Sequence, residues 1–406
     1  MKRVLFVDDE FHNLDGLRRI MRPMRDEWDM AFASSGELAL ELMAASPFDV
    51  IVSDMRMPGM DGAQLLTHVR ELYPQVVRIV LSGHTEIATA LRVVPVAHQF
   101  LAKPCDAEML RVAIERASHL LALLNDESLR SYVGALGDLP ALPRTYAELT
   151  QALEDPESSL PRIAGIVEQD QGISAKILQL VNSAFFGSPH IVTDIQTAVS
   201  YLGINTLKCL VLSVEIFRIF DSEPTLPGFS PEDLQQHAQL TAHIIGRLPV
   251  PKHIADLALA SAMLHDIGKL IEAWALPGRF AEFLGEAVST GRPLYEVEQA
   301  AFGFSHAEIG AYLLGIWGLP YAVVETVALH HAPNRVPHPS FDAPAAVYVA
   351  NILAHQLESL RGDRAQEFDL EKYREDLVRL GVWEKMTEWQ ALVQDLAEPM
   401  LDAAAN

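Results

Sequence analysis

The sequence predicts two domains of different class, an α/β domain with a doubly wound parallel sheet and an all-helical domain after it. In the first 124 residues, short β-branched runs alternate with segments of helical periodicity, as in a parallel sheet with crossover helices. Beyond about residue 135, apolar residues recur at steps of three and four with few strand-like runs. With 406 residues, half of them hydrophobic, the chain can bury two or three domain cores.

Five strands and five helices are expected in the first domain, in strict alternation. The clearest strand is the run Val50 to Val52, which is β-branched throughout and stops at an acid. The expected strands are 4–7, 30–33, 50–53, 76–81 and 99–102. The expected helices are 13–24, 35–45, 63–72, 86–93 and a last one from 106 onward.

Polar side chains stand at the carboxyl ends of four of these strands. Asp8 and Asp9 follow the first strand and Asp54 follows the third. Ser82 follows the fourth strand and Lys103 the fifth. Ligands of open α/β sheets bind outside the carboxyl ends of the strands. Each aspartate alone could be a helix cap, but three converging carboxylates favour a hard cation such as Mg²⁺.

With such a cation present, the same residues suit phosphoryl transfer. Asp54 can act as a nucleophile toward a phosphoryl group. Lys103 and the Ser82 hydroxyl can neutralise and hydrogen-bond the phosphoryl oxygens. The expected chemistry is therefore phosphorylation of Asp54.

Roughly residues 1–120 resemble the receiver domain of bacterial two-component response regulators, through VDDE, SDMRMPGMDG, LSG and KP in that order. The resemblance implies a flavodoxin-like fold and phosphorylation of Asp54 by a partner histidine kinase. Ser82 and Phe100 would be its switch pair. The resemblance assigns Mg²⁺ to Asp9, Asp54 and the backbone carbonyl of Arg56, with Asp8 acting through water.

Apolar residues at helical spacing continue from Asp106 to about Val133, past the length that the first domain needs. One long helix there would be a transmission rod or a dimer contact. A last helix followed by a linker helix explains the pattern equally well. We expect the boundaries 1–120 for the receiver domain, 121–142 for the linker helix, 143–345 for the second domain and 346–406 for a C-terminal helical extension that caps it or binds a partner.

Histidines and one His-Asp pair recur through the helical domain. They are His237, His265 and Asp266 in LHDIGKL, His306 in FSHAEIG, and His330 and His331 in ALHHAPN. Imidazole combined with carboxylate suits Fe, Mn, Zn or Ni. Lys269 lies one turn beyond Asp266, where it could neutralise a phosphate. For each histidine, ordinary packing in the core is the alternative interpretation.

Residues from about 135 to 340 resemble an HDOD domain, which is related to HD and HD-GYP phosphohydrolases and generally regarded as non-catalytic. The matching text is IVEQDQGISAKILQLVNSAFFG, TAVSYLGINTLKCLVL, LHDIGKL, FSHAEIGAYLLGIWGLP and ALHHAPN. The resemblance implies that the metal ligands of an HD-type site would be His237, His265, Asp266 and, for a dinuclear site, His306 with His330 or His331.

Two departures from the active enzymes follow from the same resemblance. Asn351 stands where an active HD enzyme has an aspartate, and a neutral amide is a poorer ligand for a divalent metal. The GYP loop is replaced by APNRVPHPSFDAP. The helical domain is therefore expected to keep at most a vestigial divalent metal site.

Composition indicates a soluble cytoplasmic protein that binds neither DNA nor membrane. Of the net charge of −23, residues 125–406 carry −19, which repels phosphate backbones. No uninterrupted apolar run approaches the length of a membrane span, and acids precede any signal-like stretch. Two cysteines, Cys105 and Cys209, provide neither a disulfide framework nor a cysteine metal site.

The sequence leaves three hypotheses for the whole chain. In the first, phosphorylation of Asp54 controls a non-catalytic adapter that binds a signalling protein such as a cyclic-di-GMP enzyme or a kinase, as a homodimer by default. In the second, it gates a metal-dependent phosphohydrolase acting on a nucleotide or cyclic dinucleotide. In the third, the helical domain holds a nucleotide without cutting it.

Overall fold

The computed structural model divides the chain into two compact units. The first consists of Met1–Asn125 with Leu153–Glu157 and Pro320–Ala322, and the second contains the rest. The structure describes residues 1–73, 76–82, 97, 99–103, 105–124, 126–135, 143–155, 158–182, 192–220, 226–336, 340–361 and 368–397.

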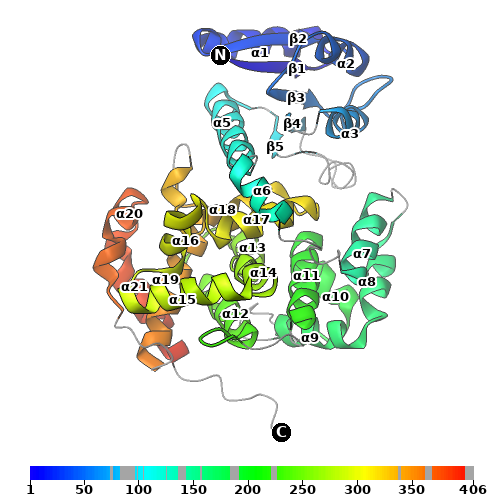
Figure 1. Ribbon diagram of the computed structural model, residues 1–406. Helices are drawn as coiled ribbons and strands as arrows, with labels where there is room; N and C mark the ends of the chain where they lie inside the picture. Colours follow the sequence, from blue (N-terminus) through cyan, green and yellow to red (C-terminus); the bar gives the residue numbers. More distant parts are fainter. Residues whose placement is uncertain are drawn as a thin grey trace. The chain divides into compact units, whose positions relative to one another are not determined.

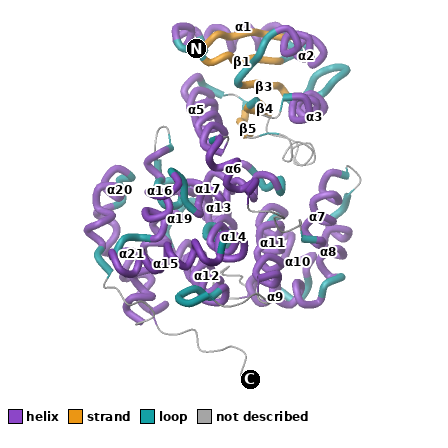
Figure 2. Tube along the Cα trace, in the orientation of Figure 1, coloured by secondary structure: helices purple, strands orange, loops and turns teal. Residues whose placement is uncertain are grey.

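The first unit contains the predicted parallel sheet. Within the described residues its strand order is β2-β1-β3-β4-β5, and every pair is parallel (Figures 1 and 2). The strands are β1 (Lys2–Val7), β2 (Trp28–Ala33), β3 (Val50–Asp54), β4 (Val77–Ser82) and β5 (Gln99–Ala102). The described helices are α1 (Phe11–Ile20), α2 (Gly36–Ala45), α3 (Gly62–Leu72) and α5 (Ala107–Leu124), with a 3-10 helix at Arg22–Asp26. The helix expected over 86–93 lies outside the described residues.

Both faces of the sheet are buried, which explains the β-branched strands. One face carries Leu5, Val7 and Ile51, which form a core cluster with residues of α2 and α3. The alternate residues Phe6 and Val52 point to the other face because side chains alternate along a strand, and they are also fully buried. Helices α1 and α5 contact the sheet outside that cluster. The order of strands places a topological switch point between β1 and β3.

The second unit is helical throughout its described residues, as the sequence predicts, apart from one isolated bridge between Leu226 and Phe229. Its α-helices are α6 (Glu127–Ala135), α7 (Arg144–Glu154), α8 (Leu160–Glu168), α9 (Gln171–Asn182), α10 (Ile195–Leu202), α11 (Ile204–Phe220), α12 (Pro231–Arg247), α13 (Lys252–Ala262), α14 (Ile267–Ala275), α15 (Pro277–Thr290), α16 (Leu294–Phe302), α17 (His306–Ile316), α18 (Tyr321–Leu329), α19 (Ala343–Arg361), α20 (Arg374–Arg379) and α21 (Met386–Val393). Short 3-10 helices lie at Pro333–Arg335, Leu370–Tyr373, Trp383–Lys385 and Gln394–Ala397.

Five of these helices form the centre of the second unit. Helix α19 packs against α12 and α13, and α14 packs against α17 (Figure 1). The expected boundary at residue 345 falls inside α19. Toward the C-terminus, Leu377 and Trp389 are buried, and α21 contacts α12.

Of the two interpretations of the apolar spacing from Asp106 to about Val133, the structure has the second, a last receiver helix followed by a separate helix. Helix α5 ends at Leu124, and α6 begins at Glu127. The Asp126 carboxylate accepts hydrogen bonds from the backbone amides of Ser128 and Leu129, so it caps the start of α6. A new N-terminus with its own cap therefore separates α6 from α5.

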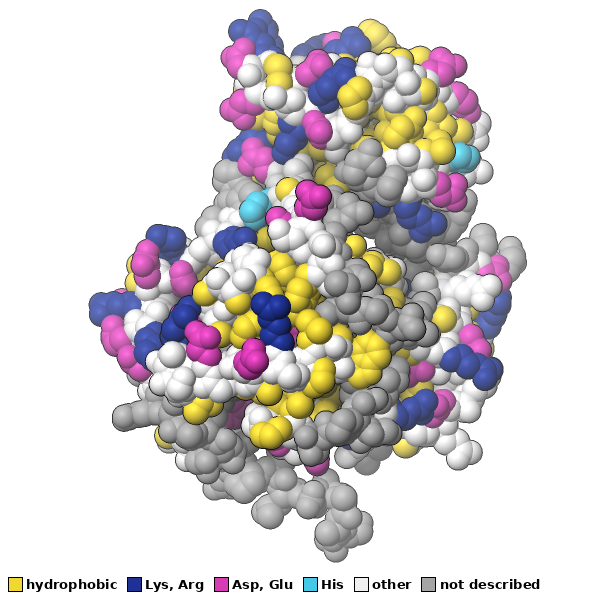
Figure 3. All heavy atoms as spheres, in the orientation of Figure 1, with side chains coloured by type: hydrophobic (Ala, Val, Ile, Leu, Met, Phe, Trp, Pro, Cys, Tyr) yellow, Lys and Arg dark blue, Asp and Glu magenta, His cyan; other side chains and the backbone are white. Residues whose placement is uncertain are grey.

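One face of the molecule shows how charged side chains are distributed on its surface. On the face shown in Figure 3, Lys and Arg side chains are interspersed with Asp and Glu. Among the described residues, no single helix has both the length and the apolar character to cross a membrane, although the bent pair Ile195–Leu202 and Thr206–Arg218 meets that criterion jointly.

Candidate functional site

The first candidate site lies at the switch point of the parallel sheet. Val7 of β1 is paired with Ser53 of β3, so Asp8 and Asp54 follow side by side at the same edge. The pairing of Ser82 in β4 with Ala102 in β5 brings the ends of those strands to this edge as well. The side chains of Ser82 and Phe100, the predicted switch pair, lie outside the described part of the structure.

Lys103 joins the two aspartates. Its Nζ lies 2.8 Å from Asp8 Oδ2 and forms an ion pair with Asp54 Oδ1. Burial lowers the pKa of Lys103, but hydrogen bonds and charges from Asp54 and Asp8 outweigh burial and raise the pKa above its ordinary value. The lysine is therefore a fixed positive charge between two carboxylates.

Asp8 is the most buried of the three acids and has several partners. It is 1% exposed, and it accepts hydrogen bonds from the backbone amide of Glu10 and from Asn13 Nδ2. Asp9 is exposed. The backbone amide of Arg56 donates to Asp54 Oδ2 at 3.1 Å, which fixes the loop after β3 against the carboxylate.

That loop requires a glycine at its end. A Cβ atom at Gly62 would lie 2.3 Å from the backbone oxygen of Asp54, so a side chain there would displace the acid. The edge thus gathers hard oxygen donors around one lysine, a donor set that fits Mg²⁺.

The second candidate site lies in the helical unit and is here called the histidine centre: the buried Asp266, His265, His306 and His330 with the half-buried His331. Asp266 Oδ1 lies 3.2 Å from His306 Nε2 and 3.5 Å from His330 Nε2. Asp266 Oδ2 lies 3.5 Å from His265 Nε2. Ligand atoms of Asp266, His306, His330 and His331 all lie within 4.8 Å of one another.

The rings of His265 and His330 turn unprotonated nitrogens toward Asp266. Their Nδ1 atoms each lie 2.7 Å from a backbone carbonyl, of Ala262 and Val327 respectively. A carbonyl only accepts, so Nδ1 carries the proton and Nε2 keeps its lone pair in the neutral ring. Among the described residues, these two Nε2 atoms and Asp266 Oδ1 have no hydrogen-bond partner although all are buried. Lone pairs facing a carboxylate in this way fit a bound cation.

Protonation states in the histidine centre also suit a cation. Burial lowers the pKa of His330, and lowers those of His265 and His331 well below the ordinary value, so these rings are neutral. Burial opposes ionisation of Asp266, but neighbouring groups, among them the Lys269 ammonium, hold its pKa well below the usual range. Metal ligands must be neutral imidazoles and ionised carboxylates.

His306 is held differently from the other rings. Its Nδ1 lies 2.6 Å from Glu298 Oε2, and its Nε2 lies 2.9 Å from His331 Nε2. Burial lowers the pKa of His306, but Glu298 and Asp266 together raise it above the ordinary value. A carboxylate on the far nitrogen of a histidine is a common way to orient a metal ligand.

His237 lies beside the histidine centre but is engaged elsewhere. Its Nε2 lies 4.0 Å from Asp266 Oδ2 and only 2.9 Å from Asn351 Oδ1. Its Nδ1 lies 2.5 Å from Glu358 Oε1. Burial raises the pKa of Glu358, but His237 and His355 more than reverse that effect and lower it. The structure thus brings His237 beside Asp266, with both ring nitrogens occupied by residues of α19.

A close helix contact holds the histidine centre together. A Cβ atom at Gly268 would lie 1.9 Å from the backbone oxygen of His306, so α14 and α17 approach each other across a bare glycine. Lys269, one helical turn after Asp266, places its Nζ 2.6 Å from Asp266 Oδ2. The sequence LHDIGKL therefore supplies the acid, the close contact and the neighbouring cation.

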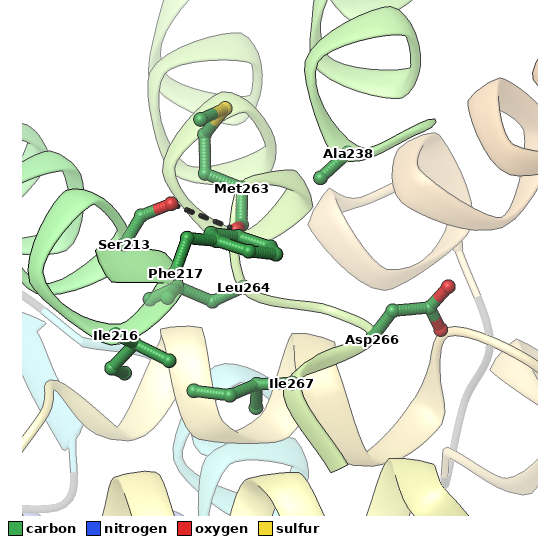
Figure 4. A pocket seen from close by; sticks show the side chains of 8 residues that line it. All are labelled: Ser213, Ile216, Phe217, Ala238, Met263, Leu264, Asp266 and Ile267. Atoms are coloured by element: carbon green, nitrogen blue, oxygen red, sulfur yellow. Dashed lines mark hydrogen bonds between the residues drawn. The ribbon is translucent and has the colours of Figure 1, made fainter. Parts of the chain in front are cut away.

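Access to the histidine centre differs between its two sides. Behind Asp266, apolar side chains including Ile216, Phe217 and Ile267 leave a cavity of about 10 Å³, and the carboxylate points away from them (Figure 4). That cavity is sized for about one water molecule. On the other side, His331 lines an open pocket of about 560 Å³, together with Arg292, Tyr295, Ser305, Glu308 and Arg335.

Sequence reasoning missed the residues that support the histidine centre. Glu298 holds His306, Glu358 holds His237, and Tyr132 bonds to Glu272 next to Glu298. The spacing of Glu358 three residues after His355 on a helix is a signal that could have drawn attention to that pair.

Fold and sites together define a two-domain protein, with a receiver-type acid–lysine site on a doubly wound sheet and a helical domain that encloses a histidine centre. Comparison with family models agrees. Residues 4–115 match the response regulator receiver domain and residues 139–333 match the HDOD domain. The chain therefore has the architecture of a response regulator: a receiver domain, which implies interaction with a kinase or another partner, followed by an HDOD domain.

Individual relatives cover parts of the chain. An uncharacterized protein of Treponema pallidum is 28% identical over 233 residues, 56% of this chain and 44% of its own length. The hydrogenase transcriptional regulatory protein HoxA of Cupriavidus necator is 36% identical over 125 residues, 30% of this chain and 25% of its own length. The chain thus spans less than half the length of these relatives.

A solved structure supports the helical fold. The HDOD domain protein of unknown function from Geobacter sulfurreducens is 21% identical, and the match covers 68% of this chain and 93% of that one with a TM-score of 0.50. At this identity, the likeness concerns the fold alone.

Proposed function

We propose that the chain is a phosphorylation-controlled response regulator whose phosphoacceptor is Asp54. The observation that carries the proposal is the ion pairing of Lys103 with both Asp8 and Asp54. An Asp54 oxygen forms a bond to phosphorus as the P–N bond of a kinase phosphohistidine breaks, and the departing imidazole takes up a proton. Lys103 is placed to neutralise the charge that develops on the phosphoryl oxygens.

Asp8, Asp9, Asp54 and the Arg56 backbone carbonyl would hold Mg²⁺ at this site. The ion supplies charge neutralisation at the phosphoryl oxygens when it is bound. Lys103 carries out the same task from the protein side, since it stays protonated. Ser82, at the end of β4, would hydrogen-bond the phosphoryl group, and Phe100 would respond to it.

Phosphorylation is tested directly by mass spectrometry. The full chain is incubated with acetyl phosphate and Mg²⁺, and the peptide containing Asp54 is analysed after quenching. We expect the mass of one added phosphoryl group in the wild type and none in Asp54→Asn. Equal labelling of Asp54→Asn would overturn the assignment.

The HDOD domain is proposed to act by binding another protein rather than by catalysis. The supporting observation is the hydrogen bond between His237 and Asn351, which occupies the nitrogen that would otherwise face Asp266. A signalling protein, such as a cyclic-di-GMP enzyme or a kinase, is the expected target. The acidic charge of residues 125–406 argues against DNA as that target.

A metal-dependent phosphohydrolase is the second candidate, favoured by one specific observation. Buried nitrogens of His265 and His330 face Asp266 without hydrogen-bond partners among the described residues. A divalent metal held there by His265, Asp266, His306 and His330 would act as a Lewis acid when bound. His331 and Lys269 would then face a substrate phosphate.

Turnover separates the two candidates. Full-length protein is purified anaerobically, its metal is measured, and hydrolysis of nucleotides and cyclic dinucleotides is followed beside Asp266→Ala. Hydrolysis that disappears in Asp266→Ala supports the enzyme. Metal-loaded protein that turns over none of these substrates supports the binding module.

A further inference from the structure

Helix α6, the first helix after the receiver domain in the chain, inserts one aromatic residue into the helical unit. The ring of Tyr132 lies 4.7 Å from that of Phe302 and 5.2 Å from that of Phe304, centroid to centroid. Its hydroxyl donates to Glu272 Oε1 at 3.3 Å. Tyr132 therefore has both a fixed packing position and a polar contact with α14.

Glu272 stands beside a second buried carboxyl, that of Glu298. Glu272 is 1% exposed and Glu298 is fully buried. Burial and the charge of Glu298 raise the pKa of Glu272 well above its ordinary value. Among the described residues, neither Glu272 Oε2 nor Glu298 Oε1 has a hydrogen-bond partner, although both atoms are buried. One proton shared between these two oxygens would satisfy both.

Glu298 also binds His306, a residue of the histidine centre. Its Oε2 accepts hydrogen bonds from the backbone amide and from Nδ1 of His306, at 2.9 and 2.6 Å. Oxygens of Glu272 and Glu298 and a ring nitrogen of His306 all lie within 4.8 Å of one another. His306 Nε2, on the opposite side of the ring, faces Asp266 at 3.2 Å.

We propose that Tyr132, Glu272 and Glu298 form a hydrogen-bonded chain through which α6 sets the orientation of the His306 imidazole in the histidine centre. These are positioning residues. Helix α6 begins at Glu127, only three residues after α5 ends at Leu124, so the hydrogen-bonded chain starts on the segment that links the receiver domain covalently to the helical domain. The proposed regulatory use rests on the proposed function, whereas the positioning of His306 does not.

The test follows the His306 ring itself by NMR of the metal-free full chain with ¹⁵N-labelled histidine. Nδ1–H protons bonded to carboxylates resonate far downfield, and the His306 signal is identified by its loss in His306→Gln. Two variants, Tyr132→Phe and Glu272→Leu, each remove a hydrogen-bonding group from the proposed hydrogen-bonded chain. A third, Glu272→Gln, keeps a neutral donor toward Glu298.

We expect the His306 signal to move upfield and to exchange faster with water in Tyr132→Phe and Glu272→Leu. In Glu272→Gln it should keep its wild-type position, because an amide also donates to a carboxylate. Tyr146→Phe, which alters a fully buried tyrosine on α7, is the matched control and should change nothing. Thermal melting verifies that each variant is folded.

An unchanged His306 signal in folded Tyr132→Phe and Glu272→Leu would overturn the proposal. So would equal effects of Glu272→Gln and Glu272→Leu, since general loosening of the core would then explain both. Metal analysis of the same proteins tests the proposed function separately. Wild-type protein that binds no metal, but shows the expected pattern of signals, refutes the metal centre and supports the positioning chain.

Discussion

His237 Nε2 is hydrogen-bonded to Asn351 Oδ1 at 2.9 Å and stands 4.0 Å from Asp266 Oδ2. A metal-binding His237 would offer its Nε2 atom to the cation. In this structure the Asn351 amide on α19 engages that nitrogen. The other ring nitrogen is held by Glu358. These contacts engage both ring nitrogens of His237, whereas the Nε2 atoms of His265, His306 and His330 face Asp266.

Asn351→Asp should strengthen metal binding by the helical domain. A carboxylate at this position adds an anionic ligand and loses the amide. We expect higher metal occupancy than in the wild type, measured by elemental analysis after identical loading. Asn351→Ala, which removes the amide without adding charge, is the control. If the aspartate and alanine variants bind equal amounts of metal, residue 351 does not limit the site.

Lys103→Met should slow phosphorylation of Asp54 by acetyl phosphate about tenfold or more, the scale expected when a preorganised charge is removed. The methionine keeps the length of the side chain but leaves Asp8 and Asp54 without their shared cation. Lys2→Met, at the opposite end of β1, should react like the wild type. Phosphoprotein gels measure both rates, and equal rates in the two variants would show that Lys103 is dispensable.

Gly268→Ala should destabilise the helical domain by about 1–3 kcal/mol or more, because the new methyl meets the His306 carbonyl. Gly285→Ala is the matched control: it changes a glycine within a helix that has nothing within 4 Å of the added Cβ. That variant should gain about 0.4–1 kcal/mol. Chemical denaturation followed by circular dichroism measures both. Similar stabilities for the two variants would contradict the close contact.

Glu272→Gln should stabilise the protein increasingly as pH rises from 5 to 8. The folded state raises the pKa of Glu272, so above about pH 4.5 the unfolded chain has released a proton that the folded chain retains. Titration of Glu272 therefore lowers the free energy of unfolding of the wild type as pH rises. Glutamine does not titrate, so the variant loses this pH-dependent contribution. The measurement is the difference in melting temperature between Glu272→Gln and the wild type at each pH. A difference that stays constant from pH 5 to 8 would argue against a protonated Glu272.

Much of the receiver domain follows from local sequence. The strand Val50–Asp54 is readable because burial on both faces demands apolar side chains, and the acid that ends it falls at the ligand-binding edge. Apolar periodicity continues across the break between α5 and α6, so by itself it left one long helix and two successive helices as equal alternatives. Asp126 followed by Glu127 was the available signal, since an acid at the N-cap and another in the first turn favour a new helix.

The histidine centre was predictable only in part. His265 and Asp266 are adjacent in the chain, so any fold brings them together. Whether they meet His306 and His330 depends on how α14, α17 and α18 pack. Only the resemblance to the HDOD family indicated that these residues come together. Partners such as Glu298 carry no local signal, because their role arises from tertiary contacts alone.

The most direct test of the account is small-angle X-ray scattering of the full chain with and without beryllofluoride and Mg²⁺, beside Asp54→Asn treated in the same way. If phosphorylation of Asp54 controls the HDOD domain, the scattering profile of the wild type should change on treatment, and that of Asp54→Asn should not. Superimposable profiles for treated and untreated wild type, with beryllofluoride bound, would contradict the central claim.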